Sequence, residues 1–218
     1  MNAAEYNRSK ATEHDALRAL GLWPFKAKAG TDAEAEEIAA WQEAHGIAAD
    51  GKCGPASWEA LRSTAAIPIG YAGVRAAYGD PRERPSKNGR LTVDDAWEKA
   101  NMRKVKLHDG RTVTLHRAVA DEFRRAFEVA CRISGYTPVS VQTYVPRCKL
   151  WNPDKPASLH TWGVAVDFDP SLNRMGRTAG TPIHNHPKFL AVFRVLGWSI
   201  GADWDMRDNM HIQRCKGC

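Results

Sequence analysis

The sequence predicts an α+β protein made of two unequal units. Apolar residues recur at helical spacing from about residue 13 to about residue 62, which predicts a small bundle of three helices. Farther along, Asp109-Gly110 stands between β-prone flanks, a hairpin signal. Strands and helices then come in groups, which favours a mainly antiparallel sheet flanked by helices. We expect the bundle over residues 1–65, a linker over 66–90 and the larger unit over 91–218.

Charge is divided unevenly between these units. Residues 1–70 carry 7 Lys and Arg against 10 Asp and Glu, whereas residues 71–218 carry 24 against 15. A basic unit of this kind suits a polyanion, whether nucleic acid, an acidic membrane surface or an anionic wall polymer. No basic helix, zinc-finger spacing or aromatic sheet motif accompanies the charge, which argues against nucleic acid. No segment approaches the ~20 apolar residues of a membrane span, so stable membrane insertion is not expected.

Local signals outline the N-terminal helices. The first twelve or so residues are expected to be unstructured, and a helix is predicted over 13–22. Thr31 and Glu34 have the form of a capping box before a second helix. Asp50-Gly51 marks a turn before a short third helix that contains Trp58. Trp58 itself is expected to be a packing residue.

Residues 12–62 resemble the three-helix peptidoglycan-binding domain. The carrying segments are 37–42, 45–47, 50–51 and 54–61, in which glycines, tryptophans and the Asp-Gly turn keep their intervals. The resemblance implies that this unit anchors the protein to peptidoglycan.

The most informative stretch is residues 158–169, Ser-Leu-His-Thr-Trp-Gly-Val-Ala-Val-Asp-Phe-Asp. Its alternation predicts a strand with one apolar face and one face of small residues and carboxylates. A catalytic zinc site needs three protein ligands and an open fourth position. His160 and Asp167 are candidate ligands here, and His211 is the best third. Asp208, three residues before His211, is the candidate general base, ahead of Asp203 and Asp205. The plain alternative for the three ligands is a buried ion-pair network.

The pattern Ser-x-His-x-x-Gly-x-Ala-x-Asp, followed by Asp-x-x-His at 208–211, resembles a family of zinc peptidases. The family comprises D-Ala-D-Ala carboxypeptidases and L-alanyl-D-glutamate endopeptidases, with many phage endolysins among them. The resemblance implies a Zn²⁺ cofactor held by His160, Asp167 and His211, with Asp208 as catalytic base.

One departure from that family concerns an arginine. Family members place it directly after a Gly-Tyr pair, whereas here it follows Tyr144 at a greater distance, as Arg147. Arg147 is therefore either the group that stabilises the oxyanion or a surface charge. Ser158, Tyr144 and Trp204 are expected to contact substrate.

Together, the two resemblances imply an endolysin that hydrolyses a stem-peptide bond, L-Ala–D-Glu by expectation, and we expect it to be a monomer. No secretory signal pattern opens the sequence, so we expect storage in the host cytoplasm and release through a separate membrane pore. Two alternatives stay open: a D-Ala-D-Ala carboxypeptidase of wall turnover, and a non-catalytic peptidoglycan-binding protein. Cys215 and Cys218 are expected to lie in a frayed tail.

Overall fold

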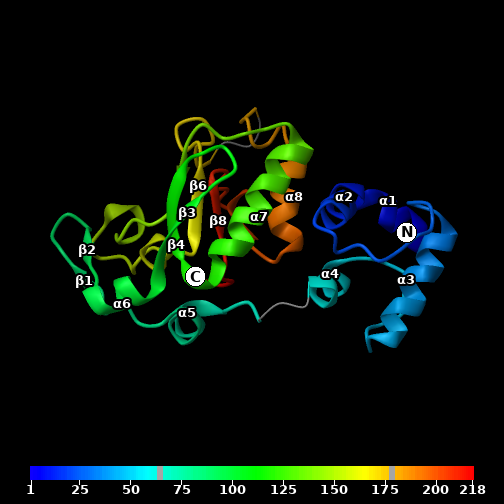
Figure 1. The fold of residues 1–218 in the computed structure, drawn as a ribbon, viewed down its shortest axis with the longest axis horizontal. Coiled ribbons are helices and arrows are strands. Elements are labelled where there is room, and N and C mark those ends of the chain that lie inside the picture. Colours follow the sequence, from blue (N-terminus) through cyan, green and yellow to red (C-terminus); the bar gives the residue numbers. More distant parts are fainter. Residues whose placement is uncertain (63–65, 177–179) are drawn as a thin grey trace.

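The computed structural model describes residues 1–62, 66–176 and 180–218 (Figure 1). All regular elements of its N-terminal part are helices, and they are grouped on one side of the molecule (Figure 1). The helices are α1 (Ala3–Ser9), α2 (Ala11–Ala19), α3 (Asp32–Ala44) and α4 (Pro55–Arg62). The bundle therefore has four helical segments in place of the three that the sequence predicts.

The additional helix is α1, in the segment expected to be unstructured. Asn2 and Glu5 form a reciprocal capping box: the Glu5 amide donates to Asn2 Oδ1 at 2.8 Å and the Asn2 amide to Glu5 Oε2 at 2.9 Å. Asn7 is buried and ties α1 to the later turn, since its Nδ2 donates to Gly51 O and its Oδ1 accepts from the Cys53 amide, both at 2.9 Å. These two devices explain why the end of the chain is ordered.

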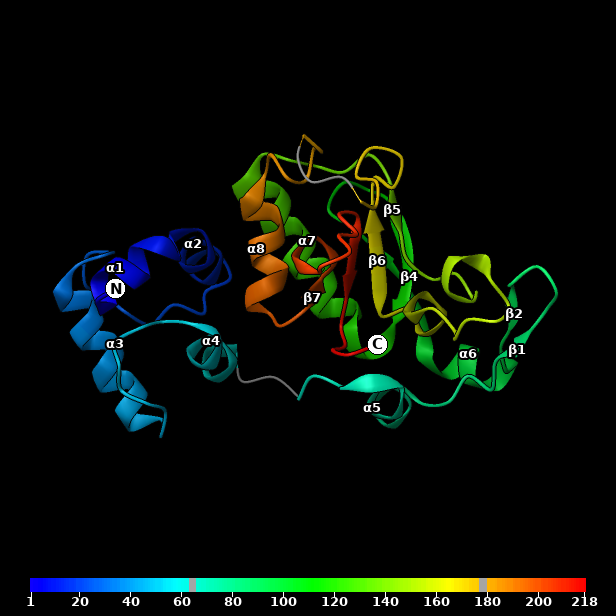
Figure 2. The same cartoon turned by 180° about the vertical axis from the view of Figure 1, so that it is seen from behind.

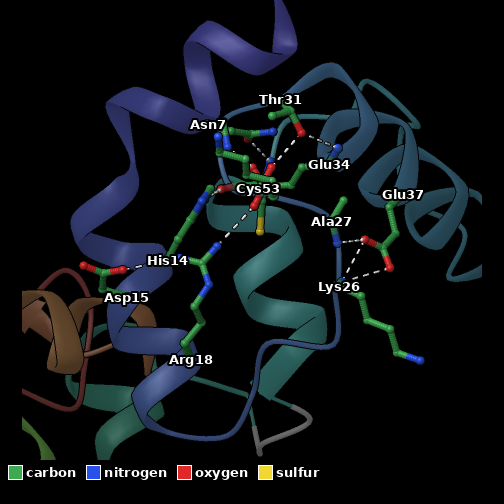
Figure 3. A network of polar contacts seen from close by, with 12 residues as sticks. Asn7, His14, Asp15, Arg18, Lys26, Ala27, Thr31, Glu34, Glu37 and Cys53 are labelled. Carbon is green, nitrogen blue, oxygen red and sulfur yellow. Dashed lines mark hydrogen bonds and ion pairs between the residues drawn. The ribbon is translucent and has the colours of Figure 1, made fainter.

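A buried carboxylate organises the start of α3 (Figure 3). Thr31 caps the helix as predicted, accepting from the Glu34 amide at 3.3 Å. The Glu34 side chain is wholly buried and accepts from the Gly30 amide at 2.7 Å and from Arg18 at 3.1 Å. In a full capping box the Glu34 side chain would accept from the Thr31 amide. Here it accepts from the Gly30 amide and from Arg18 instead, and thereby links α2 to α3.

The range 66–90, expected to be a linker, contains helix α5 (Gly70–Tyr78) and packs on the larger unit. The Tyr71 hydroxyl donates to Ala157 O at 2.5 Å and the Tyr78 hydroxyl to Arg214 O at 2.9 Å. Val74, between them, is fully buried. The Gly and Pro residues of the range suggested a linker, but the helical spacing of these three apolar residues determines the structure.

The larger unit begins with two hairpins separated by a short helix. The second hairpin turns at Asp109-Gly110, as the sequence predicts, and leads into the long helix α7. The elements are β1 (Arg84–Pro85), β2 (Leu91–Thr92), α6 (Asp95–Asn101), β3 (Met102–Lys106), β4 (Thr112–His116) and α7 (Arg117–Ser134).

The remaining strands form a four-stranded sheet in the order β5-β6-β8-β7, and each neighbouring pair is antiparallel. Helices α7 and α8 pack together against it, around a cluster of phenylalanines that includes Phe123 and Phe168. The fold is thus α+β with an antiparallel sheet. The bounds are β5 (Val141–Gln142), β6 (Ala165–Phe168), α8 (Pro187–Val195), β7 (Ser199–Ile200) and β8 (His211–Gln213). No helix among the described residues is long and apolar enough to cross a bilayer.

The N-terminal helices dock on the larger unit through α8 (Figure 2). Lys188 pairs with Asp15 at 3.0 Å, and Arg194 with Glu13 at 3.5 Å. Helix α2 thus packs against α8 and supplies both carboxylates.

The C-terminal tail is ordered, contrary to the expectation that it frays. The Lys216 amide donates to Pro68 O at 2.9 Å, and Lys216 O accepts from the Gly70 amide at 2.8 Å. Cys215 is fully buried and both tail cysteines are free thiols. Pairing with the segment before α5 supplies the backbone partners that a free tail would lack.

We expect Asn7→Ala to destabilise the N-terminal helices by about 2 kcal/mol, because it leaves two buried backbone groups unsatisfied. Urea denaturation followed by circular dichroism measures this change. Glu36→Ala, at an exposed position of α3, is the matched control and should shift the midpoint little. Equal midpoints for the two variants would show that α1 is not held through Asn7.

Candidate metal centre

The pairing of β6 with β8 places Asp167 directly opposite His211. His160 arrives from a 3-10 turn, η2 (Leu159–Trp162), immediately before β6. Gly163 ends that turn at φ 62°, and a Cβ there would lie 2.9 Å from the His116 amide nitrogen. Glycine is therefore required for η2 and β6 to approach the hairpin of β3 and β4 so closely.

His160, Asp167 and His211 form a compact, buried cluster. Their candidate donor atoms all lie within 4.8 Å of one another. Asp167 bridges the two rings, with Oδ2 3.1 Å from His160 Nε2 and Oδ1 2.8 Å from His211 Nδ1. Among the described residues, no other group of three or more His, Cys, Asp or Glu side chains brings its donor atoms close enough to hold a metal ion.

Outer contacts fix both imidazole rings. His160 Nδ1 lies 2.6 Å from Thr143 O, and a carbonyl only accepts, so Nδ1 carries the proton. His211 Nε2 lies 3.1 Å from Gln213 Oε1, which assigns its outer proton in the same way. The nitrogens that face Asp167 are thereby turned inward, the arrangement in which histidines bind metals.

The donor chemistry fits zinc. Two imidazoles and one carboxylate are a ligand set of catalytic zinc sites. The buried His160 Nε2 makes no hydrogen bond, although it faces the Asp167 carboxylate. A buried nitrogen without a hydrogen-bond partner is costly unless it receives a proton or a metal ion.

The pKa shifts within the cluster reflect its internal pairing. Burial raises the pKa of Asp167, but the close His160 and His211 imidazoles outweigh it and hold that pKa well below its usual range. Burial alone would lower the pKa of His211, and the Asp167 carboxylate overcomes this and raises it. Protons therefore compete with a metal ion for Nδ1 of His211, the ring nitrogen that faces Asp167.

Asp208 lies beside this cluster with one oxygen unpaired. Its backbone is held by a close turn, in which the Asp208 amide donates to Gly201 O at 2.9 Å and Asp208 O accepts from the His211 amide at 3.0 Å. Its buried Oδ1 has no hydrogen-bond partner. Burial raises the pKa of Asp208, which increases its affinity for a proton.

A pocket of about 420 Å³ opens over the cluster and collects most of the predicted site residues. Arg147 reaches it, with Nη2 4.0 Å from Asp167 Oδ2. Trp204 lines it with its ring centroid 5.5 Å from that of His211. Ser158 lines it too, and its Oγ accepts from the His160 amide at 3.4 Å.

Tyr144 is the predicted substrate contact that the structure does not bring to the pocket. Its buried hydroxyl faces Glu98 of α6, and burial followed by that carboxylate raises its pKa. Asp203 pairs with Arg194 at 2.9 Å and Asp205 is exposed, so neither competes with Asp208. Tyr144 lies beyond the end of β5, so strand alternation does not determine which way its side chain points.

Gln213 is the site residue that the sequence reasoning missed. It lies two residues after His211 on β8, which places both side chains on one face of the strand. That spacing is the signal that could have identified it.

Residues 152–214 match the family model of the D-alanyl-D-alanine carboxypeptidases. No curated protein and no solved structure matches the chain. The matched segment, less than a third of the chain, contains the three cluster residues and Asp208 and excludes Arg147. The match supports metallopeptidase chemistry for the residues that line the pocket.

We expect the protein to bind one zinc ion, with a stabilisation of about 2.7 kcal/mol at a hundredfold excess over Kd. Thermal unfolding with and without zinc and a chelator measures this. His160→Ala and His211→Ala should each remove the shift, whereas His108→Ala, at an exposed position, should keep it. Affinity should fall as pH decreases, because protons compete with the metal ion for His211, whose pKa is raised. A zinc shift that survives both ligand variants would place the metal elsewhere.

We expect Gln213→Leu to weaken zinc binding by roughly 10- to 100-fold, because the His211 ring loses the acceptor that orients it. Competition with a chromogenic chelator gives the affinity. Gln142→Leu on β5 is the control, since Gln142 is exposed and belongs to the same sheet. Unchanged affinity in Gln213→Leu would mean that the ring is held by packing alone.

Proposed function

We propose that the protein is a zinc-dependent peptidase that cuts the stem peptide of peptidoglycan. One observation carries the proposal: Asp167 and His211 of the three-residue cluster line the same pocket as Asp208, which has a buried, unpaired carboxylate oxygen. The family match over the same residues supports it.

His160, Asp167 and His211 would hold the metal. A bound zinc ion would supply Lewis acidity, polarising the scissile carbonyl and lowering the pKa of water in the pocket. Asp208 accepts a proton from the attacking water, for which its raised pKa suits it, and returns the proton to the leaving amine. Arg147, whose guanidinium lies at the pocket, donates hydrogen bonds to the developing oxyanion.

The finer proposal is an endolysin that cuts L-Ala–D-Glu. Its support is the resemblance of residues 12–62 to a peptidoglycan-binding domain, together with the positive charge of residues 71–218, which suits the carboxylates of stem peptides. We further propose that the protein acts as a monomer, and that it stays in the host cytoplasm until a separate membrane pore releases it to the wall.

A D-Ala-D-Ala carboxypeptidase is the second candidate, because the matching family model carries that description. The zinc chemistry is the same in both cases, and the difference lies in the bond. Digestion of purified peptidoglycan with mass spectrometry separates the two. A new N-terminal D-Glu identifies the endopeptidase, and loss of a terminal D-Ala identifies the carboxypeptidase. A protein that binds zinc and releases neither from several wall types would be a non-catalytic binding protein.

We expect Asp208→Asn to lower kcat by about 10²- to 10⁴-fold, because the amide cannot accept the proton of water. Metal analysis of the same variant should still give one zinc per chain, since Asp208 is not a proposed ligand. Asp203→Asn, outside the pocket, is the matched control and should retain activity. A fully active Asp208→Asn would overturn the proposed mechanism.

A further inference from the structure

One rim of the pocket is the loop of residues 147–157, which lies beside the β1–β2 hairpin (Figure 1). Two large apolar side chains of this loop line the pocket and face solvent. Leu150 is 61% exposed and Trp151 47% exposed. Neighbouring exposed apolar groups at the mouth of a pocket are typical of binding surfaces.

The backbone of this loop is strained where these side chains stand. Leu150 and Trp151 have φ values of 56° and 58°, the left-handed region that non-glycine residues avoid. Such a conformation costs on the order of 1–3 kcal/mol per residue and persists only where the surroundings impose it. Here the Lys149 amide donates to Pro156 O at 2.9 Å and the Cys148 amide to Gly89 O at 2.8 Å.

Gly89 provides the support beneath Trp151. It has φ 74°, and a Cβ at this position would lie 2.2 Å from Trp151 O. The β1–β2 turn can therefore approach the strained loop only with glycine at position 89. The hairpin thus sets the position of the rim.

The rim is also cationic. Lys149 and Lys155 line the pocket together with Arg147, whereas the described acidic residues that line it are Asp167 and Asp208, both at the metal centre. The guanidinium carbon of Arg147 lies 5.7 Å from the Trp151 ring centroid and that of Arg90 lies 6.0 Å from it. An apolar surface surrounded by positive charge is complementary to a peptide that carries both carboxylates and small apolar side chains.

We propose that Lys149, Leu150, Trp151 and Lys155 form a recognition wall that binds an acidic segment of the stem peptide beside the scissile bond. This proposal depends on the proposed function. It adds a preference for stem peptides in which the α-carboxylate of D-Glu is free over those in which it is amidated. Gly89 is a positioning residue that acts through Trp151.

The charge preference is tested with two synthetic stem peptides that differ only in the D-Glu α-carboxylate, free in one and amidated in the other. Wild type should show a KM about 3- to 10-fold lower for the acid. The double variant Lys149→Gln/Lys155→Gln should lose this difference while kcat changes little. Lys104→Gln/Lys106→Gln, a pair of exposed lysines on β3, is the matched control and should keep it.

The apolar part is tested with Trp151→Ala and Gly89→Ala. Both should raise KM for both peptides by about tenfold, with kcat nearly unchanged. Gly110→Ala is the control for Gly89→Ala, because Gly110 also has a positive φ, 89°, but open space around its missing Cβ. Loss of stability without a KM change is the result expected of Gly110→Ala.

The outcomes separate the wall from the function. If wild type cleaves and the wall variants keep its KM values and its acid preference, the wall is wrong and the function stands. If wild type cleaves neither peptides nor peptidoglycan, the function is wrong, and calorimetric titration of both peptides decides the wall. If wild type binds the acid peptide more tightly than the amide and the lysine double variant loses this difference, the recognition wall stands without the function. If wild type binds neither peptide, the wall is wrong as well as the function.

Discussion

The arrangement of the site depends on one carboxylate, that of Asp167, which contacts the imidazole rings of both His160 and His211. The Asp167 carboxylate lies between the inner nitrogens of His160 and His211, across the junction of β6 and β8. A slip of this strand pair by one residue would turn Asp167 or His211 to the opposite face of the sheet and dissolve the cluster. The phenylalanine core between the sheet and helices α7 and α8 fixes that register, so the packing of the apolar face and the chemistry of the polar face are a single constraint.

The sequence predicted those parts of the site in which local spacing determines position. Strand alternation indicated His160 and Asp167 as candidates, and the resemblance of the Asp-x-x-His interval to the peptidase family supported His211 and Asp208. The structure brings the three ligand candidates together and places Asp208 beside them. The hairpin at Asp109-Gly110 and the helix after it followed from equally local signals. The α+β fold class could be predicted from the grouping of the expected strands and helices along the sequence.

Other features depend on contacts between distant segments, which spacing does not reveal. Helix α1 is stabilised by Asn7 bonding to a turn more than forty residues later. Tyr144 turns toward Glu98 of helix α6, and only tertiary packing places that helix beside Tyr144. The strained pair Leu150 and Trp151 has no sequence signature at all, because its conformation is imposed by the neighbouring hairpin.

The pairing of Lys216 with Pro68 and Gly70 brings together the two ends of the larger unit. The chain enters this unit and leaves it at nearly the same point, on either side of one short bridge. Units whose ends lie adjacent tolerate transplantation into a surface loop of another protein and rejoining of their termini. Residues 66–218 therefore have the geometry of a cassette, in which new ends could be opened at the exposed Asp109-Gly110 turn without cutting the strands that carry Asp167 and His211.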